Sequence, residues 1–550
     1  MKTSLFAALL AGLLTVAGAA AVASSRPTTP LDGLLEDVLG HHGHAPAGAD
    51  EAAMHHGMAG DAHDAQLGMD RPRFAPAQGS TPTADDAKKL EQVSSLRVNG
   101  DHGFTPKAGV RSGSGTLADP YVISGYAVTG SLYLGDTDAC VVITGNYVDG
   151  ELALNWNGNC VHVHHNFIRD LRVNENVARE GDDTGGLIEL NTINYVGQIR
   201  HYDGEFRNNV VGPRDDAKLP FGVFQDPENL LPFAKDTRVL NIDGFNQGWF
   251  HHNTITGSVD LKLHGHHHST GFLATHSHYH GDNATRLAMM QHDHTNRWES
   301  VRFEDNKVVD PAGYGVRYTD EAHAGDDRTA PSETTKSLGD DHQHHTKVTI
   351  ARNTLVGAGL WVDVFNADDK LHTQRNPGWF WIVDNTIQLQ QRHDGLLGTQ
   401  MFGQRHDPNT GIRVDTAKEM QMDIRGNTLS WQATSSSDPT ADLLGGLLRG
   451  GQPVPVGIAL SGVRDGDVSI MDNRGTGFTQ GVAGFNMDKL ARWAVAGNDF
   501  PGAAHPVYYD ESVANQPTTQ PVPPLADPGA WGPGAEPMDE SMAGMHHHGT

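Results

Sequence analysis

The residues best suited to chemistry are histidines gathered between positions 264 and 294. Nine of the 33 His in the chain lie in this stretch, and three of them alternate in Thr275-His276-Ser-His278-Tyr-His280. In an extended segment, alternate side chains point to the same side about 7 Å apart, and imidazole nitrogen is a ligand of Cu(II), Zn(II) and Ni(II). The sequence therefore predicts a metal site made of His264, His266, His267, His268, His276, His278, His280, His292 and His294.

Segments near both ends combine imidazole with the thioether of methionine. Met-His-His-Gly-Met covers 54–58, and Gly-Met-His-His-His covers 544–548. Thioether is a soft ligand that suits Cu(I), whereas imidazole also binds Cu(II) and zinc. We expect secondary metal ligands here, with copper as the favoured ion and zinc second: Met54, His55, His56, Met58, Met545, His546, His547 and His548.

Charge and composition exclude other classes of function. The chain has 67 Asp+Glu against 40 Lys+Arg, which gives a formal net charge of −27 with His neutral. A nucleic-acid-binding protein needs a basic surface, so nucleic acid is not an expected partner. No later apolar run reaches the ~18 residues of a membrane span, so no transmembrane segment is expected.

The first residues have the features of a secretory signal. Lys2 precedes an apolar run from Leu5 to Val16, and small residues follow up to Ala23. This pattern predicts a signal peptide over 1–23, cleaved near Ala23, and a secreted, periplasmic or cell-surface location. Residues 24–95, rich in His and Met, and the Pro-rich residues 511–550 contain too few apolar side chains to fold alone, so we expect two disordered tails.

The middle of the chain carries a repeat centred on asparagine. Cys140-Val-Val-Ile-Thr-Gly-Asn146 and Cys160-Val-His-Val-His-His-Asn166 align at a period of 20, with an apolar residue three positions before each Asn. The successive intervals between these Asn are 20, 25, 18, 44, 53, 47, 32, 42, 46 and 25 residues, so the longer ones contain a degenerate repeat, an inserted loop, or both. The copies share one register, at Asn146, Asn166, Asn191, Asn209, Asn253, Asn306, Asn353, Asn385, Asn427, Asn473 and Asn498.

Repeats of this length indicate a solenoid. Alternation within each copy has period two, as in Val161-His-Val-His, so each copy is a strand with an inward and an outward face. Asn suits a corner because it tolerates the left-handed conformation, and stacked Asn side chains can hydrogen-bond from copy to copy. The sequence predicts an all-β fold, a right-handed single-stranded parallel β-helix over 96–510 with inserted His-rich loops; its hand follows the general crossover preference.

This repeat is similar to that of a known group. Gly113-Ser-Gly115-Thr-Leu-Ala-Asp119-Pro-Tyr-Val-Ile123 resembles the N-terminal motif of NosD-like secreted β-helix proteins. The Asn-cornered copies resemble the pectin-lyase-like superfamily over roughly residues 110 to 500. The resemblance implies a surface-exposed or periplasmic protein, with copper handling in one branch and polysaccharide cleavage or epimerisation in others. The His-rich segments lie outside the shared pattern.

The two cysteines of the chain occupy equivalent positions of adjacent copies. Neighbouring strands lie ~4.8 Å apart, within the ~4.4–6.8 Å Cα separation of a disulfide, and an exported protein meets oxidising conditions. A disulfide between Cys140 and Cys160 is the favoured interpretation. A copper–thiolate site with His162 and His164 is the alternative.

Further His lie on the predicted strands. Pairs of His directly precede Asn166 and Asn253, and another His shares the outward face of the first strand. Glu189 and Arg207 hold the equivalent position in the intervening copies, so no continuous row of imidazoles is expected. We interpret these side chains as solvent-facing polar residues: His162, His164, His165, His251 and His252.

These features favour a secreted or periplasmic β-helix protein that binds copper for sequestration, delivery or tolerance rather than redox catalysis. The alternative is a polysaccharide-active enzyme, a lyase, epimerase or hydrolase, with Lys262 and Arg286 near the reacting sugar. Trp361, Trp379 and Trp381 are then candidate sugar platforms. A third interpretation is a glycan-binding or adhesive surface protein whose His change charge with pH. The expected partners are metal ions, with polysaccharide or a periplasmic or cell-surface component in the alternatives.

Overall fold

The computed structural model describes the repeat region and short segments on either side of it. All of these residues lie in one compact unit, Gly60–Thr550. The described residues are 74–158, 160–176, 186–202, 204–213, 238–243, 247–263, 298–309, 314–320, 345–363, 378–390, 409–415, 420–433, 454–463, 466–485, 487, 492–509, 513 and 516–525.

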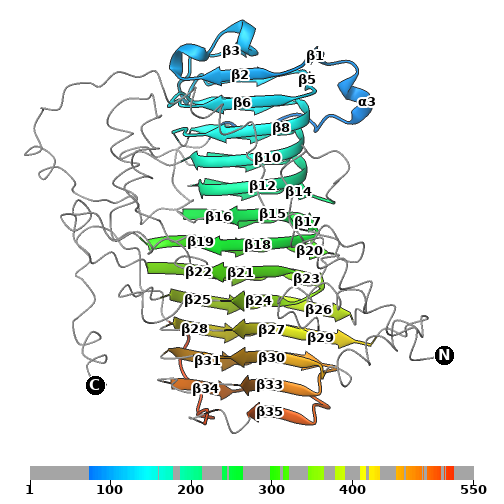
Figure 1. Cartoon of the computed structure of the whole chain (residues 1–550), viewed down its shortest axis with the longest axis vertical. Coiled ribbons are helices and arrows are strands. Elements are labelled where there is room, and N and C mark those ends of the chain that lie inside the picture. Colours follow the sequence, from blue (N-terminus) through cyan, green and yellow to red (C-terminus); the bar gives the residue numbers. More distant parts are fainter. Residues whose placement is uncertain are drawn as a thin grey trace, which may run out of the picture. The chain divides into compact units, whose positions relative to one another are not determined.

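Almost no helix occurs in this part of the chain. The helical elements are α3 (Ala84–Ala87) and the 3-10 turns η3 (Asp101–Gly103) and η4 (Pro106–Ala108). None of the helices found among the described residues is long and apolar enough to cross a membrane. The fold is thus all-β, and its strands lie one above another in Figure 1, from β2 in blue to β35 in orange-red.

One strand of each repeat belongs to a sheet of thirteen strands, here called sheet B. Only its first pair, β3 with β4, is antiparallel; every later pair is parallel. In order the strands are β3 (Val110–Ser112), β4 (Tyr121–Ser124), β7 (Val141–Thr144), β9 (Val161–His164), β11 (Gly186–Glu189), β13 (Gly204–Arg207), β16 (Gln247–His251), β19 (Trp298–Glu304), β22 (His345–Ala351), β25 (Gly378–Val383), β28 (Met420–Arg425), β31 (Asp467–Met471) and β34 (Arg492–Ala496).

The strands after each Asn form a second, 22-stranded sheet, here called sheet A, in two columns. Three long strands pass through both columns: β8 (Tyr147–Asn155), β10 (Phe167–Asn176) and β12 (Thr192–Tyr202). The column directly after the Asn also contains β1 (Glu91–Val93), β5 (Tyr126–Val128), β14 (Val210–Val211), β17 (Thr254–Thr256), β20 (Lys307–Val309), β23 (Thr354–Gly357), β26 (Thr386–Gln390), β29 (Thr428–Gln432) and β32 (Arg474–Thr476). The other column contains β2 (Leu96–Asn99), β6 (Ser131–Gly135), β15 (Arg238–Asp243), β18 (Ser258–Leu263), β21 (Val316–Asp320), β24 (Leu360–Asp363), β27 (Thr410–Asp415), β30 (Val456–Ser461), β33 (Gln480–Phe485) and β35 (His505–Tyr509).

The strand register places each residue beside its counterpart in the next repeat, and the stacked apolar side chains form the core. In sheet B the apolar residue three before each Asn pairs with its counterpart in the next repeat, for example Phe206 with Phe250 and Phe250 with Phe303. These three Phe side chains are at most 1% exposed. Because side chains alternate across a strand, the same register places the polar residues of sheet B on its opposite, outward face.

The repeat asparagines form one continuous hydrogen-bonded ladder inside the stack. Each Asn Nδ2 donates to Oδ1 of the Asn in the next repeat at 2.9–3.2 Å, from Asn146 to Asn498. Each Asn backbone N–H donates to the same oxygen at 2.9–3.1 Å. The amide also donates to the carbonyl of the inward residue one repeat back, as Asn306 does to Phe250 at 2.9 Å. The ladder therefore satisfies the polar groups that the bend of the chain leaves inside the core.

The left-handed residue of each corner is the one before the Asn, and not the Asn itself, so the conformational reason we gave for Asn is wrong. Positive φ angles of 52–68° occur at residues 145, 165, 190, 208, 252, 305, 352, 384, 426, 472 and 497, and at none of the repeat Asn. The Asn is selected because its buried amide both donates and accepts along the ladder. The preceding residue makes the turn.

The ladder also decides between a degenerate repeat and an inserted loop. Asn209 bonds directly to Asn253 and Asn253 to Asn306, although 44 and 53 residues separate them. Each of these intervals is therefore a single repeat with an insertion, much of which lies outside the described residues.

The ordered structure extends beyond the limits 96–510 that composition suggests. Before residue 96, Thr83 caps α3 through a capping box and β1 pairs with β5. After residue 510, Thr518 forms a β-bridge with Ala494 in sheet B. Segments poor in apolar residues are ordered here because backbone hydrogen bonds to the sheets replace a core of their own.

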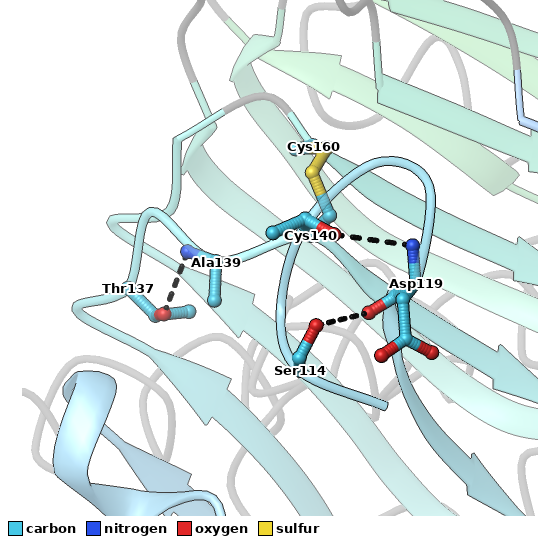
Figure 2. Close-up of a disulfide and its surroundings, with 7 residues drawn as sticks. Ser114, Asp119, Thr137, Ala139, Cys140 and Cys160 are labelled. Carbon is cyan, nitrogen blue, oxygen red and sulfur yellow. Dashed lines mark hydrogen bonds between the residues drawn. A yellow bond between two sulfur atoms is a disulfide. The ribbon is translucent and has the colours of Figure 1, made fainter. Parts of the chain in front are cut away.

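A disulfide joins the first repeats, as the spacing of the two Cys predicts. Cys140 and Cys160 are bonded, with Cα atoms 4.6 Å apart, so their sulfurs do not form the alternative copper–thiolate site. Figure 2 shows the bond beside the loop that carries Ser114 and Asp119. Cys140 N–H donates to the carbonyl of Gly115 at 2.8 Å. Gly115 itself has φ +84°, and a Cβ added to it would lie 2.6 Å from the Tyr121 ring. The Gly-rich motif thus fits closely against the disulfide.

The ladder predicts a large loss of stability when an internal Asn is removed. Asn306→Ala deletes the donors and acceptors that serve Phe250, Asn253 and Asn353, and we expect the free energy of unfolding to fall by about 3–5 kcal/mol. Chemical denaturation measures it. Asn498→Ala at the half-buried end of the ladder is the control and should cost clearly less; equal losses would contradict the ladder as the source.

The corner conformation predicts that one substitution stabilises the chain. Leu190 has φ +56°, which costs a branched residue roughly 1–2 kcal/mol. We expect Leu190→Asn to raise the free energy of unfolding by about 1 kcal/mol, measured by denaturation. Val210→Asn is the control, at an exposed strand position without a left-handed φ. It should not raise the free energy of unfolding, and a rise there would contradict the corner conformation as the cause.

Candidate functional site

The residues that the sequence assigns to metal binding lie outside the described part of the chain. This holds for His264, His266, His267, His268, His276, His278, His280, His292 and His294. It holds also for Met54, His55, His56, Met58, Met545, His546, His547 and His548, and for residues 1–23. The structure therefore does not test these predictions, and the candidate site is built from the imidazoles that the structure describes.

Five of the described imidazoles lie on the outward side of sheet B or at the corners that follow its strands: His162, His164, His165, His251 and His252. We call the outward side chains of β9, β11, β13, β16 and β19, together with the corner residues His165 and His252, the imidazole face. Along one line of this face the register aligns His164, Glu189, Arg207, His251 and Glu304. The neighbouring line carries His162, Leu187, Glu205, Trp249 and Arg302.

A buried ion-pair network lies at the N-terminal end of the imidazole face. His162 Nε2 lies 3.0 Å from Glu189 Oε1, and Arg207 Nε donates to Glu189 Oε2 at 3.0 Å. Arg207 also donates to Glu205 at 2.6 Å. Burial by itself raises the pKa of Glu189, but the hydrogen bonds and charges of His162 and Arg207 outweigh it and lower that pKa to about 2. Glu189 is therefore a carboxylate at neutral pH.

The first pair of adjacent histidines, His164 and His165, lies at the end of β9. His164 Nδ1 lies 2.9 Å from His165 Nδ1 and 3.1 Å from Thr144 Oγ1. Burial, reinforced by His162 and His165 and opposed by Glu189, lowers the pKa of His164 to about 4. Burial also lowers the pKa of His165. Both rings are neutral at physiological pH, which is the state that binds a metal ion or shares a single N–H···N hydrogen bond.

The second pair repeats this geometry three repeats further along the stack. His251 Nδ1 lies 2.8 Å from His252 Nδ1. His251 stacks on Trp249 with ring centroids 4.0 Å apart, and Trp249 Nε1 donates to Glu304 at 3.1 Å. Arg302 in turn bonds Glu304 and covers the Trp249 ring. The tryptophan thus fixes the position of the His251 ring from one side.

The interpretation of these His as solvent-facing polar residues is wrong for three of the five. His162, His164 and His251 are only 1%, 6% and 7% exposed, whereas His165 is half-buried and His252 exposed. One physical reason is the segment before the first strand: the Phe74 ring packs on His162 at 4.9 Å, and Thr81 donates to the Leu190 carbonyl at 3.0 Å. The twofold occurrence of His-His-Asn was the available sequence signal for the pairing.

The other end of the outward side of sheet B is held by the segment 516–525. Val495 N–H donates to the Thr518 carbonyl, Leu525 N–H to Asp423 at 3.1 Å, and Trp381 Nε1 to the Leu525 carbonyl at 3.2 Å. Trp379 is buried. Trp379 therefore has no open face for a sugar, whereas Trp381 is half-buried and its ring nitrogen is held by this segment.

A separate charged cluster lies on the outward side of sheet A. Tyr314 donates to Asp260 Oδ1 at 2.6 Å, and Arg317 holds both oxygens of Asp260 at 3.1 and 3.0 Å. Trp361, also buried, donates to Asp415 at 2.9 Å. Because Asp260 is fully buried and bonded by these groups, its carboxylate serves the packing of β18 and β21 rather than acid–base chemistry on a polymer.

The imidazole face thus brings imidazole nitrogens together in pairs rather than in larger groups. Within those residues, no group of three or more His, Cys, Asp or Glu is arranged to hold a metal ion. No protein-family model, curated protein or solved structure matches the chain. Its function must therefore be argued from the residues themselves.

The Glu189 network predicts a pH-dependent contribution to stability. Glu189→Gln should lower the free energy of unfolding by about 1–3 kcal/mol at pH 7, because it removes charge-assisted hydrogen bonds. The pKa of Glu189 falls from 4.5 to about 2 on folding, so this contribution is complete above about pH 4.5 and disappears as the pH falls toward 2. Denaturation of both chains at several pH values measures the gap.

The matched control is Glu91→Gln, which breaks an ion pair between exposed side chains, Arg111 and Glu91. We expect this substitution to cost less than about 0.5 kcal/mol. A gap for Glu189 that stays constant from pH 7 down to pH 2.5 would contradict the lowered pKa.

Proposed function

We propose that the chain is an exported metal-binding protein, with copper as its preferred ion and zinc second, acting in sequestration, delivery or tolerance. The observation that carries the proposal is the imidazole face, on which two His pairs hold their Nδ1 atoms 2.9 and 2.8 Å apart. Imidazole nitrogens at this spacing are suited to a transition-metal ion. The His-rich 264–294 segment and the His/Met segments near both ends add ligand types that copper uses in both oxidation states.

The scaffold that we propose is a right-handed parallel β-helix of the NosD-like or pectin-lyase-like kind. In support, each repeat contributes parallel strands to sheet B and to the columns of sheet A, with an Asn between them. The right hand follows from the general preference of parallel crossovers. A rigid scaffold of this kind supports a metal site because it fixes the ligand side chains before the ion arrives.

Export is part of the same proposal. The apolar run after Lys2 ends in small residues, and the disulfide between Cys140 and Cys160 is of the type that persists in oxidising compartments. A protein in such a compartment meets metal ions without the reducing buffers of the cytosol. Sequestration or delivery is then a role that needs ligands and a stable scaffold but no reaction.

Metal analysis of the full chain tests the proposal. We expect protein purified without chelators to bind several Cu(II) ions with submicromolar affinity, and Ala at the nine His between 264 and 294 to remove part of that capacity. Inductively coupled plasma analysis and competition titration measure both quantities. The double variant His102→Ala, His505→Ala, at two exposed positions on other elements, is the control and should change neither.

Binding that is micromolar or weaker, and equal in all three chains, would contradict the proposal. Release of unsaturated or shortened oligosaccharides from uronate polymers would favour the polysaccharide-active alternative instead. Association that depends on pH without any metal would favour the adhesive alternative.

A further inference from the structure

We infer that the two His-His corners, His164–His165 and His251–His252, are separate chelating sites for a divalent ion of square-planar preference, best matched by Cu(II). The inference rests on the proposed function, because it names the residues and the coordination by which the imidazole face takes its metal. It goes beyond the His-rich segments, since all four side chains belong to the repeats.

The separation of the two Nδ1 atoms is the first argument. It is 2.9 Å in the first corner and 2.8 Å in the second. Two cis ligands at metal–nitrogen distances of about 2.0 Å are about 2.8 Å apart in a square-planar site but about 3.3 Å apart in a tetrahedral one. This spacing is that of the N–H···N hydrogen bond in the metal-free pair, and it is nearer to the ligand spacing of a square-planar Cu(II) or Ni(II) site than to that of a tetrahedral Zn(II) site.

The backbone holds this spacing before any ion binds. His165 and His252 have φ angles of +52° and +55°, and their rings stand nearly perpendicular to those of His164 and His251, at 86° and 82°. The Asn that follows each pair donates to the carbonyl of its first His at 2.9 and 3.0 Å. Because the same three-residue sequence gives the same geometry in two repeats, the corner itself determines how the rings meet.

Binding an ion replaces one hydrogen bond by two metal–nitrogen bonds without a net change in protons. In the metal-free pair one Nδ1–H donates to the other Nδ1. When an ion binds, the donor ring carries its proton on Nε2 instead, and both Nδ1 lone pairs face the ion. His251 Nε2 suits this tautomer: it is buried, has no hydrogen-bond partner among the described residues, and lies 3.7 Å from Glu205 Oε2.

A carboxylate side chain lies beside each corner and affects how the corner binds a cation. In the next repeat each pair is followed by a buried carboxylate, Glu189 or Glu304, whose hydrogen bonds to Arg, His or Trp keep it in place. Such carboxylates offset the charge of a nearby cation without being its ligands. With two nitrogens per corner, the remaining coordination positions are left for water or a small solute.

The two corners differ on the side of the preceding repeat. Thr144 Oγ1 lies 3.1 Å from His164 Nδ1 and adds an oxygen at the first corner. Arg207 stands beside His251 at the second, with its guanidinium bonded to Glu189 and Glu205. A neutral oxygen favours a cation more than a guanidinium does, so we expect the first corner to bind Cu(II) more tightly.

Asn substitutions at the left-handed corner residues test the inference. The variants are His165→Asn, His252→Asn and the double variant, each made in the full chain. Asn removes the imidazole and tolerates positive φ, and Asn208 already occupies the same corner position with φ +52°. Thermal unfolding checks that the fold persists, and His102→Ala with His505→Ala is the matched control for loss of exposed His.

The readouts are Cu(II) stoichiometry, affinity by competition titration, and electron paramagnetic resonance. We expect the double variant to bind two Cu(II) fewer at high affinity, and each single variant to weaken one ion by about 10- to 100-fold, at least the cost of losing a supporting partner of a ligand. The corners are three repeats apart, or about 14 Å. Two loaded corners should therefore broaden each other's Cu(II) signal, and either single variant should remove that broadening.

The outcomes separate the two proposals. If the full chain binds no Cu(II), the proposed function and the inference both fail. If it binds Cu(II) but the double variant keeps the same number of high-affinity ions and the same spectrum, only the inference fails. Equal affinity for Zn(II) and Cu(II) at the corners would also overturn the square-planar assignment.

Discussion

The asparagine ladder is the interaction on which the rest of the structure depends. A chain that turns sharply between two sheets brings backbone amides and carbonyls into the core, where each unpaired group costs about 1–3 kcal/mol. One amide side chain per repeat satisfies two of these backbone groups, as Asn306 does for the Phe250 carbonyl and the Asn253 N–H, and it also donates to Oδ1 of Asn353. The ladder also keeps every repeat in the same register, because each Asn must reach the next.

This register gives the outward side of sheet B its chemical character. With the Asn fixed, the residue before it takes the left-handed corner and the residue two before it ends the strand on the outward face. When both are His, the two rings meet through Nδ1. The same positions carry Glu189 with Leu190, Arg207 with Asn208, and Glu304 with Asp305 in other repeats. The fold accommodates different side chains at these positions, so chemistry can vary along the stack while the fold is maintained.

Both ends of the described structure return to the outward side of sheet B. Phe74 and Thr81 contact the first repeats that carry His, and Thr518 and Leu525 contact the last strands. Exposed sheet surface is thereby covered, and His162 and Asp423 are buried although they point away from the core. The disulfide between Cys140 and Cys160 joins the first repeats, where the stack has few neighbours.

The sequence by itself determined the period-two strands, the positions of the corners and the partner of each cysteine. These follow from local rules: apolar residues must alternate in a strand, and equivalent residues of stacked repeats must lie one strand spacing apart. The same rules identified Asn146 to Asn498 as one series across intervals of 18 to 53 residues. The reason for Asn was misjudged, since its role depends on partners in the neighbouring repeats.

Only the tertiary structure decided which polar residues are covered and which of them meet. His162 and His164 read as surface residues because alternation distinguishes inward from outward but does not show what covers the outward side. The Nδ1 atoms of His164 and His165 lie 2.9 Å apart because the second residue has a left-handed φ, and this conformation is a property of the corner rather than of either His. Contacts such as Phe74 with His162 join residues far apart in the sequence, and no periodic pattern encodes them.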